Sequence, residues 1–325
     1  MEENYSCYYD LDRTIGEEEE VFRVELNGGG YEEFPNKIFE LTNLRKLQIY
    51  SNLFLNVPKE VNKLHYLQEL YLDFNCIEEL PEALFVMENL EQLSLVQNWI
   101  EQLPNQIPLN DKLKYLYLDN NQIQNLPESL SNLSNLKDIN LSNNQLDEFE
   151  LVLTKLSKLK RLSLDENNIT SIPKEIAKLE LLNDLSLGRN QISNLPKEVF
   201  QITSLEELNV KYNPIESLHP DIGNLINLRR LDLSVTQLRH LPNEITQLKN
   251  LEVLVLTKTP LISLPEEISQ LTGLRELSVA VTPMKKLPTS IAYLPNIEAI
   301  WVSNANVENV QELIDLNPRL EKVFR

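Results

Sequence analysis

The chain has 325 residues and carries 30 lysines and arginines against 49 aspartates and glutamates, which gives a formal net charge of −19 and a pI near 4.7. A negative field of that size repels phosphate backbones and anionic lipid, so nucleic acid and membranes are not expected partners and a basic protein surface is favoured. The two cysteines and three histidines show no metal-ligand spacing, and the run Gly28–Gly30 lacks the Lys and Ser or Thr that should follow in a phosphate loop. We therefore expect no metal, no cofactor and no enzymatic activity.

Residues 1–20 carry no repeat and are predicted to form an N-terminal cap. The apolar residues Tyr8, Tyr9, Leu11 and Ile15 recur at spacings of three and four, which predicts a short amphipathic helix. The start of the chain has no basic and apolar segments of a signal peptide, and no later segment approaches the ~18 apolar residues of a membrane span. Two cysteines are too few for paired-cysteine caps. These features predict a cytoplasmic protein, with signal-independent secretion left open.

A pattern of 23 residues then recurs from Val21 to the end of the chain without insertion or deletion, which predicts one repeat domain of about 13 units over residues 21–325. The clearest unit is Leu113–Asn135, where Leu113, Leu116 and Leu118 have the alternation of a short strand and Leu130 and Leu133 have helical spacing. Identical returns every 23 residues place successive strands side by side and parallel. Each unit is too small to fold alone, so we expect the units to stabilise one another by stacking.

The consensus LxxLxLxxNxIxxLPxxIxxLxx resembles that of leucine-rich repeat proteins, specifically the 23-residue LPxxI class found in many bacterial and intracellular eukaryotic members. The resemblance implies an α/β solenoid, a curved right-handed horseshoe with a parallel β-sheet on its concave face and short helical or 3-10 segments on its convex face. It also implies that the protein acts by binding other proteins through that sheet. The motif is specific for the fold and much less so for the function.

The asparagine position of the consensus changes along the chain. An inward-facing asparagine can satisfy backbone groups of adjacent turns with both its amide and its carbonyl, whereas threonine offers one hydroxyl on a shorter stem. We therefore expect differently wound turns in the last third of the chain, with neutral drift between equivalent ladders as the alternative. The ladder residues are Asn52, Asn75, Asn98, Asn121, Asn144, Asn167, Asn190 and Asn213, followed by Thr236, Thr259 and Thr282.

The proline position of the consensus is filled in ten of thirteen units, and Glu150, His219 and Gln311 occupy the other three. Without the proline break, the segment after Glu150 is expected to form a more regular helix. The last unit predicts a helix from about Glu308 to Leu316 and then a short strand, which would serve as a C-terminal cap.

The side chains that alternate with the buried leucines are expected on the concave face and are the candidate binding residues. Three groups stand out: an N-terminal aromatic band, a charged middle next to the small residues Ser186 and Gly188, which predict a shallow depression, and a C-terminal apolar patch. A tyrosine also suits any strand surface, and the C-terminal cap can cover the patch. Trp99 is predicted to be a packed rim residue instead. The candidates are Tyr50, Tyr71, Phe74, Tyr115 and Tyr117, then Arg161 and Asp165, then Val253, Val255 and Trp301.

These features favour a non-enzymatic recognition module that binds a protein or peptide with a basic surface, as a monomer or weak homodimer. Self-association through the face from Val253 to Trp301 is one alternative. A secreted effector or immunity factor that inhibits an enzyme in trans is another.

Overall fold

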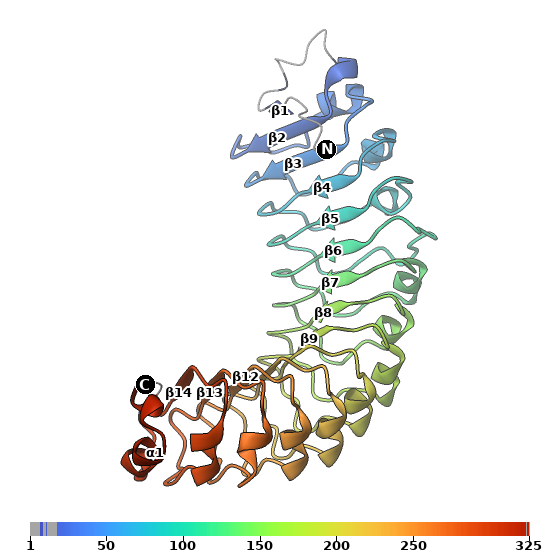
Figure 1. Ribbon diagram of the computed structural model, residues 1–325. Helices are drawn as coiled ribbons and strands as arrows, with labels where there is room; N and C mark the ends of the chain where they lie inside the picture. Colours follow the sequence, from blue (N-terminus) through green and yellow to red (C-terminus); the bar gives the residue numbers. More distant parts are fainter. Residues whose placement is uncertain (1–6, 9–10, 12–17, 323, 325) are drawn as a thin grey trace. The chain divides into compact units, whose positions relative to one another are not determined.

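A computed structural model describes residues 7–8, 11, 18–322 and 324 of the chain (Figure 1). The chain divides into two compact units, residues 1–162 and 163–325, which are described separately. The predicted Tyr9 and Ile15 lie outside the described residues. Tyr8 belongs to a strand that pairs with the first repeat, so the amphipathic helix predicted around it is wrong at that position.

In unit 1 (residues 1–162), the strands pair in parallel and in the order of the sequence. The register advances by 23 residues per strand from β2 onward, as in the pairs Leu47↔Leu70 and Leu93↔Leu116. The strands are β1 (Cys7–Tyr8), β2 (Arg23–Asn27), β3 (Lys46–Tyr50), β4 (Glu69–Tyr71), β5 (Gln92–Ser94), β6 (Tyr115–Tyr117) and β7 (Asp138–Asn140). Strand β8 (Arg161–Ser163) contains the boundary between the units.

In unit 2 (residues 163–325), the same parallel pairing continues with the same 23-residue register, as in Leu208↔Leu231. The strands are β9 (Asp184–Ser186), β10 (Glu207–Asn209), β11 (Arg230–Asp232), β12 (Val253–Val255), β13 (Glu276–Ser278) and β14 (Ala299–Trp301). The helix α1 (Val310–Leu316) follows β14, and a bridge between Ile300 and Phe324 comes after it. The predicted terminal helix is confirmed, and the short strand after it is reduced to this bridge.

Short 3-10 segments follow the strands and lie on the side of each unit opposite its sheet (Figure 1). The predicted combination of parallel strands and 3-10 segments is thus confirmed in both units. The segments are Glu18–Glu20, Asn36–Glu40, Lys59–Lys63, Glu82–Leu84, Glu128–Asn132, Leu151–Lys155, Lys174–Lys178, Lys197–Gln201, Pro220–Asn224, Asn243–Gln247, Ile268–Gln270, Thr289–Tyr293 and Pro318–Lys322.

The segment after Glu150 is a 3-10 segment like its neighbours, so the more regular helix predicted there is wrong. The backbone of Glu150 adopts φ −65° and ψ 116°, close to the φ that proline imposes at this position in other repeats. Its carboxylate also accepts a hydrogen bond from the N–H of Leu126 at 3.1 Å. At Glu150 the backbone thus has the conformation that proline imposes in other repeats, and the side chain makes a hydrogen bond to the preceding repeat.

The core consists of the consensus leucines, isoleucines and valines, which are almost fully buried from Val21 to Leu320. The ladder asparagines close each turn. In Asn144, the amide donates to the carbonyls of Leu118 and Leu141 at 3.0 Å each, and its oxygen accepts the N–H of Ile123 at 2.9 Å. In the last repeats, Thr259 donates to Leu256 O at 2.8 Å within its own repeat. The inter-repeat bonds of the asparagines have no counterpart at Thr259 among the hydrogen bonds of the described residues.

The residue before each ladder position adopts a left-handed backbone conformation that turns the chain away from the strand. From Ser51 to Asn304, twelve non-glycine residues at this position have φ between 52° and 60°. Most are polar residues, but Val235 and Val281 are β-branched, and a β-branched residue is strained in this conformation.

Candidate functional site

The sheet face of each unit, defined as the strand side chains that alternate with the buried leucines, carries most of the predicted binding residues. In unit 1 it is acidic and aromatic, and its side chains are half-buried and engaged with one another. In unit 2 the sheet face carries charged, polar and apolar side chains.

Tyr50 and Tyr71 form the first aromatic cluster, on strands β3 and β4. Their rings meet edge to face with centroids 6.4 Å apart. Lys46 Nζ lies 2.7 Å from Glu69 Oε2 and 4.8 Å from the centre of the Tyr71 ring. The hydroxyl of Tyr71 donates to the same carboxylate oxygen at 2.9 Å, and Gln48 donates to the hydroxyl of Tyr50 at 2.6 Å. These contacts hold the two rings in place.

The pKa values in this cluster follow from its contacts. Burial alone would raise the pKa of Glu69, but hydrogen bonds from Lys46 and Tyr71 outweigh burial and hold it below its ordinary value. Burial and the hydrogen bond to the Glu69 carboxylate raise the pKa of Tyr71 far above its ordinary value. The Tyr71 phenol thus stays protonated as a donor, and Glu69 stays ionised.

Tyr115 and Tyr117 lie on β6, two strands away. The register aligns Tyr71 with Ser94 and Ser94 with Tyr117, so the small, buried Ser94 separates the two aromatic groups. The predicted aromatic band is therefore two clusters and not one continuous stripe. Tyr117 donates to Asp138 Oδ2 at 3.3 Å, and the guanidinium of Arg161 lies 2.6 Å from the same oxygen. Burial and the negative charge of Asp138 raise the pKa of Tyr117.

Asp73 and Asp119 lie just beyond the ends of β4 and β6, on the same side as the tyrosines. Asp73 is 8% exposed and accepts hydrogen bonds from Ser94 Oγ at 2.6 Å and from the N–H of Val96 at 2.8 Å. Asp119 accepts a hydrogen bond from Asn140 Nδ2 at 3.0 Å. Burial raises the pKa of both carboxyl groups. Two carboxyl groups that are largely withdrawn from water therefore lie on this face beside the tyrosines.

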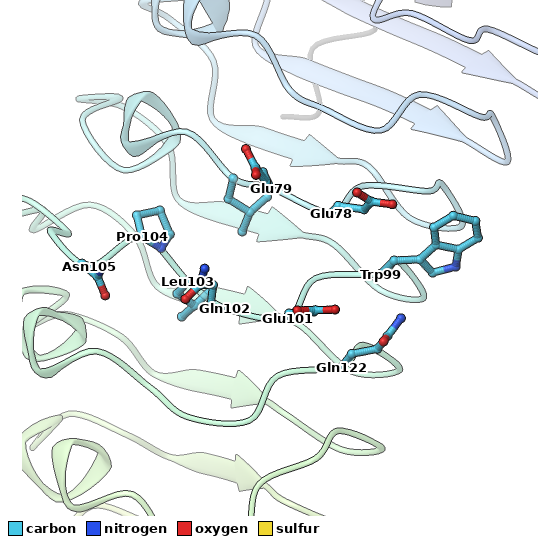
Figure 2. Close-up of a pocket in the computed structure, with 10 residues that line it drawn as sticks. Glu78, Glu79, Trp99, Glu101, Gln102, Leu103, Pro104, Asn105 and Gln122 are labelled. Atoms are coloured by element: carbon cyan, nitrogen blue, oxygen red, sulfur yellow. The ribbon is translucent and has the colours of Figure 1, made fainter.

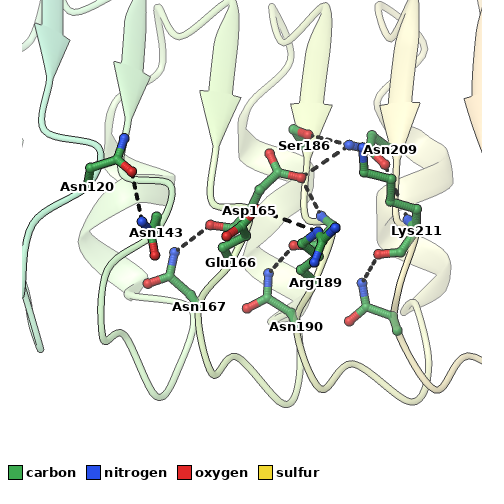
Figure 3. Close-up of polar contacts among 12 residues, drawn as sticks. Asn120, Asn143, Asp165, Glu166, Asn167, Ser186, Arg189, Asn190, Asn209 and Lys211 are labelled. Carbon is green, nitrogen blue, oxygen red and sulfur yellow. Dashed lines mark hydrogen bonds and ion pairs between the residues drawn. The ribbon is translucent and has the colours of Figure 1, made fainter. Parts of the chain in front are cut away.

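Asp165 organises a polar network on the sheet face of unit 2 (Figure 3). Its carboxylate accepts hydrogen bonds from the N–H of Gly188 at 2.8 Å and from Asn209 Nδ2 at 3.1 Å, and Asn209 also donates to Ser186 Oγ at 2.8 Å. A Cβ atom on Gly188 would lie 2.6 Å from Asp165 Oδ1. The depression predicted beside Ser186 and Gly188 is therefore wrong, because the carboxylate and the Asn209 amide fill it.

A second part of this network lies at the strand ends. The guanidinium of Arg189 lies 4.4 Å from the centre of the Tyr212 ring and 3.5 Å from the Glu166 carboxylate. In unit 1, Asn143 donates to Asn120 at 2.7 Å at the equivalent turn position (Figure 3). Such exposed contacts order the side chains but add little to stability.

Val253, Val255 and Trp301 are half-buried on β12 and β14, but the sheet does not bring them together. The register places Glu276 and Ser278 of β13 between them. The valines and Trp301 therefore do not form one continuous apolar surface along the strands, because each valine meets a polar residue on β13. The wider predicted patch, which also includes Val235, Ala280, Val281 and Ala299, stays a prediction.

Two aromatic residues lie at the edge of the sheet in unit 1: Phe74, which is a predicted binding residue, and Trp99, which is not. Phe74 follows β4, is 50% exposed and has a left-handed backbone with φ 58°. Trp99 follows β5 and is 48% exposed, so the prediction that it is packed is wrong. Because the indole lies at the position just after the ladder asparagine, it points away from the core, which the neighbouring Ile100 fills.

Figure 2 shows Trp99 beside a shallow groove of about 510 Å³ that runs along the descending segments of two consecutive repeats. The sequence pattern did not indicate this groove. The only signal in the sequence is in the same repeat, where Asn110 replaces the last leucine of the consensus shortly after Pro108. The lining residues are Glu78, Glu79, Leu80, Trp99, Glu101, Gln102, Leu103, Pro104, Asn105 and Gln122.

Within the part of the chain that the structure describes, no group of three or more His, Cys, Asp or Glu side chains is placed to hold a metal ion. Among the same residues, no helix is both long and apolar enough to cross a membrane.

Comparison with protein-family models matches most of the chain to leucine-rich repeats. Residues 42–100 and 157–215 match "Leucine rich repeat", residues 111–153 match "Leucine Rich repeats (2 copies)" and residues 213–321 match "Leucine-rich repeat region". No curated protein matches the chain.

Solved structures give the same result. The chain is 31% identical to a leucine-rich repeat protein of Leptospira interrogans, with a TM-score of 0.81 over 93% of this chain and 83% of that one. It is 23% identical to the internalin InlF of Listeria monocytogenes, with a TM-score of 0.75 over 86% and 80% of the two chains. It is 20% identical to the plant peptide hormone receptor RGFR1 in complex with RGF2, with a TM-score of 0.69 over 92% and 57%.

Proposed function

Because this chain belongs to the leucine-rich repeat family, whose members are generally protein–protein interaction modules, we propose that it is a non-enzymatic recognition module whose sheet face binds a protein or peptide. The observation that carries the proposal is the ordered aromatic and acidic surface of unit 1. Tyr50, Tyr71 and Tyr117 are half-buried, and each hydroxyl is already hydrogen-bonded to a neighbouring side chain.

Prior ordering matters because binding otherwise has to immobilise the contact side chains, at about 0.5–1.5 kcal/mol for each. Tyrosine offers a large contact area with only two rotatable side-chain bonds, which is why it is enriched where binding energy concentrates. The rings of Tyr50 and Tyr71 restrain one another, so their surface is available at low entropic cost.

We further propose that the partner presents a basic surface. Asp73 and Asp119 are desolvated acids on the same face as the tyrosines, and the chain as a whole carries a net charge of −19. A cationic partner would be steered toward this face and would relieve the cost of the buried charges. The plant receptor with the same fold is in complex with RGF2, which is consistent with a peptide as one class of partner.

The remaining assignments are part of the same proposal. Residues 1–20 are an N-terminal cap, residues 21–325 are the repeat domain, and the last unit is the C-terminal cap. The pairing of β1 with β2 and the position of α1 after β14 support this division. The low cysteine content supports a cytoplasmic location, and the polar residues of β13 between the valines and Trp301 support a monomer over a tight homodimer.

The test is affinity capture from the native cytosol, with bound proteins identified by mass spectrometry. The variants are Tyr117→Ala and Trp301→Ala, alone and together, and the control is Tyr293→Ala. Tyr293 is an aromatic residue with 68% exposure on a 3-10 segment, away from the sheet face.

We expect a partner that the wild type and Tyr293→Ala recover and that the double variant loses. Purified partner should then bind Tyr117→Ala at least ~5-fold more weakly, which is the loss of about 1 kcal/mol that marks an energetically important contact. A partner lost only with Tyr293→Ala would place the site on the opposite side. Recovery of the protein alone, together with a mass in light scattering that rises with concentration, would replace the proposal with self-association.

A further inference from the structure

We propose that the groove beside Trp99 is a second docking surface, distinct from the sheet face, that takes an arginine side chain from a basic segment of a protein partner. The guanidinium would stack on the exposed indole and bond to the carboxylates of Glu78 and Glu101. This surface is defined here as the Trp99 groove: Glu78, Glu79, Trp99, Glu101, Gln102 and Asn105.

The position of Trp99 shows that its exposure is built into the repeat. Its N–H donates to Ile77 O at 2.9 Å, the same bond that Leu53 makes to Tyr31 O two repeats earlier. The backbone is thus fixed to the preceding repeat, and the side chain has to point outward. The indole is 48% exposed, and Leu53 at the equivalent position is 54% exposed.

The charges of the groove select the partner. Figure 2 shows Glu101 on the same segment as Trp99 and Glu78 on the neighbouring segment of the preceding repeat, with Glu79 further along that segment. Among the described residues, none of these three carboxylates takes part in an ion pair. Other acids of unit 1 do so, as in Lys46–Glu69 at 2.7 Å. An exposed tryptophan beside carboxylates that have no ion pair among the described residues is complementary to a cation.

Arginine fits these features better than lysine. Its planar guanidinium stacks on an aromatic face and at the same time presents several N–H donors to carboxylates, whereas a lysine ammonium is a compact and strongly hydrated point charge. Tryptophan is the aromatic residue that attracts a cation most strongly. The groove is too shallow and polar for a bulky apolar ligand, because three glutamates and three amide side chains line it.

The repeat that contains Trp99 is irregular at the other end of the groove as well. No 3-10 segment is found between β5 and β6, although every other interval from β2 to β14 contains one among the described residues. Instead the chain has no helix or strand around Asn105. The Asn105 carbonyl accepts a hydrogen bond from Ser129 Oγ at 2.9 Å, and the same hydroxyl accepts the N–H of Ile107 at 2.9 Å. Bonds to the next repeat therefore fix the far end of the groove, and the groove is preformed.

The experiment measures fluorescence anisotropy of a fluorescein-labelled peptide amide, Gly-Arg-Gly-Arg-Gly, titrated with the full-length protein. Two further peptides carry citrulline or lysine in place of arginine. The variants are Trp99→Ala and the double change Glu78→Gln with Glu101→Gln. Glu216→Gln is the matched control, because Glu216 occupies the position of Glu78 in a repeat of unit 2, is exposed and has no ion pair among the described residues.

We expect Trp99→Ala to weaken binding of the arginine peptide by roughly 5- to 30-fold, the range of a partly desolvated cation–π contact. The double glutamine variant should weaken it by at least as much, and Glu216→Gln by less than about 2-fold. The citrulline peptide, which keeps the shape and loses the charge, should not bind measurably. Tyr117→Ala should bind as the wild type does, which separates this surface from the proposed sheet-face function.

Several results would overturn the proposal. Equal losses for Glu216→Gln and the double glutamine variant would mean that the peptide senses only the net charge. Unchanged affinity in Trp99→Ala would remove the indole from the site, and a loss in Tyr117→Ala would move the peptide to the sheet face. Tighter binding of the lysine peptide would reject arginine as the occupant. Trp301→Phe leaves Trp99 as the only tryptophan. If the arginine peptide at saturation does not change the fluorescence of Trp99 in this variant, the peptide does not stack on the indole and the assignment is wrong.

Discussion

Replacing Asn144 with alanine tests how much the ladder of buried asparagines stabilises the repeats. The Asn144 amide donates to Leu118 O and Leu141 O, one bond to the previous repeat and one within its own. Its oxygen is the acceptor for the buried N–H of Ile123. Alanine removes these three bonds and a longer one from the same amide to Ser142 O at 3.3 Å, which is not counted in the sum. The two lost carbonyl bonds cost about 1 kcal/mol each, and the N–H left without a partner costs about 1–3 kcal/mol, so the sum is roughly 3–5 kcal/mol.

Two further substitutions show how much of this loss comes from each bond and how much a control change costs. Asn144→Thr copies the residue found at Thr259, which donates to the carbonyl three residues before it. It should keep the bond to Leu141 O and cost about 1 kcal/mol less than alanine. Gln145→Ala changes the exposed neighbour, and we expect an effect within about 0.5 kcal/mol.

The assay combines the midpoint of urea unfolding with amide hydrogen exchange at Ile123. Unfolding of a long repeat protein need not be two-state, so the local exchange rate is the direct measure of the lost bond. We expect the Ile123 amide to lose protection in Asn144→Ala and Asn144→Thr and to keep it in Gln145→Ala. If Asn144→Ala unfolds at the same urea concentration as Gln145→Ala, the ladder does not provide the stability assigned to it.

Three other predictions follow from the same structure. Gly188→Ala should destabilise the protein by about 1–3 kcal/mol because its Cβ overlaps Asp165 Oδ1, and adding Asp165→Ala should recover part of the loss in urea unfolding. Burial raises the pKa of Asp73, so the stability of the wild type is highest below the unfolded pKa of about 3.9 and falls as pH rises through the folded pKa; the uncharged Asp73→Asn should therefore become more stable relative to the wild type as pH rises above about 4, measured by unfolding midpoints. Val281→Asn should raise stability by about 1 kcal/mol because asparagine tolerates φ 58°, and an unchanged midpoint would show that valine is not strained there.

The fold was predictable because its determinants are local and repeated. One 23-residue pattern specifies the strand, the ladder asparagine and the 3-10 segment, and the register between strands follows from its exact recurrence. Where the pattern failed as a guide, a contact between repeats was responsible. The carboxylate of Glu150 reaches Leu126 in the preceding repeat, and spacing alone does not show whether a side chain makes such a bond.

The candidate site was predictable only by position. The alternation of each strand correctly assigned Tyr71 and Tyr117 to the sheet face, but the grouping of residues there depends on what the intervening strand carries. Ser94 separates the tyrosines, and Ser278 separates Val255 from Trp301. The filling of space beside Gly188 likewise depends on Asp165, which is 23 residues away and has to bend toward it.

Backbone strain differs between the turns, and the strained positions distinguish residues that serve stability from residues that serve binding. Every turn from Ser51 to Asn304 has a left-handed residue, and asparagine at Asn120 and Asn143 meets that need at low cost. Phe74 and Val281 meet it at a higher cost, and they are 50% and 42% exposed, so the strain is not offset by burial. Stability alone would favour asparagine at both. Strain that persists at an exposed side chain indicates a contact made by that side chain. A substitution to asparagine that stabilises the protein and weakens binding of its partner would show that stability is given up for binding at that position.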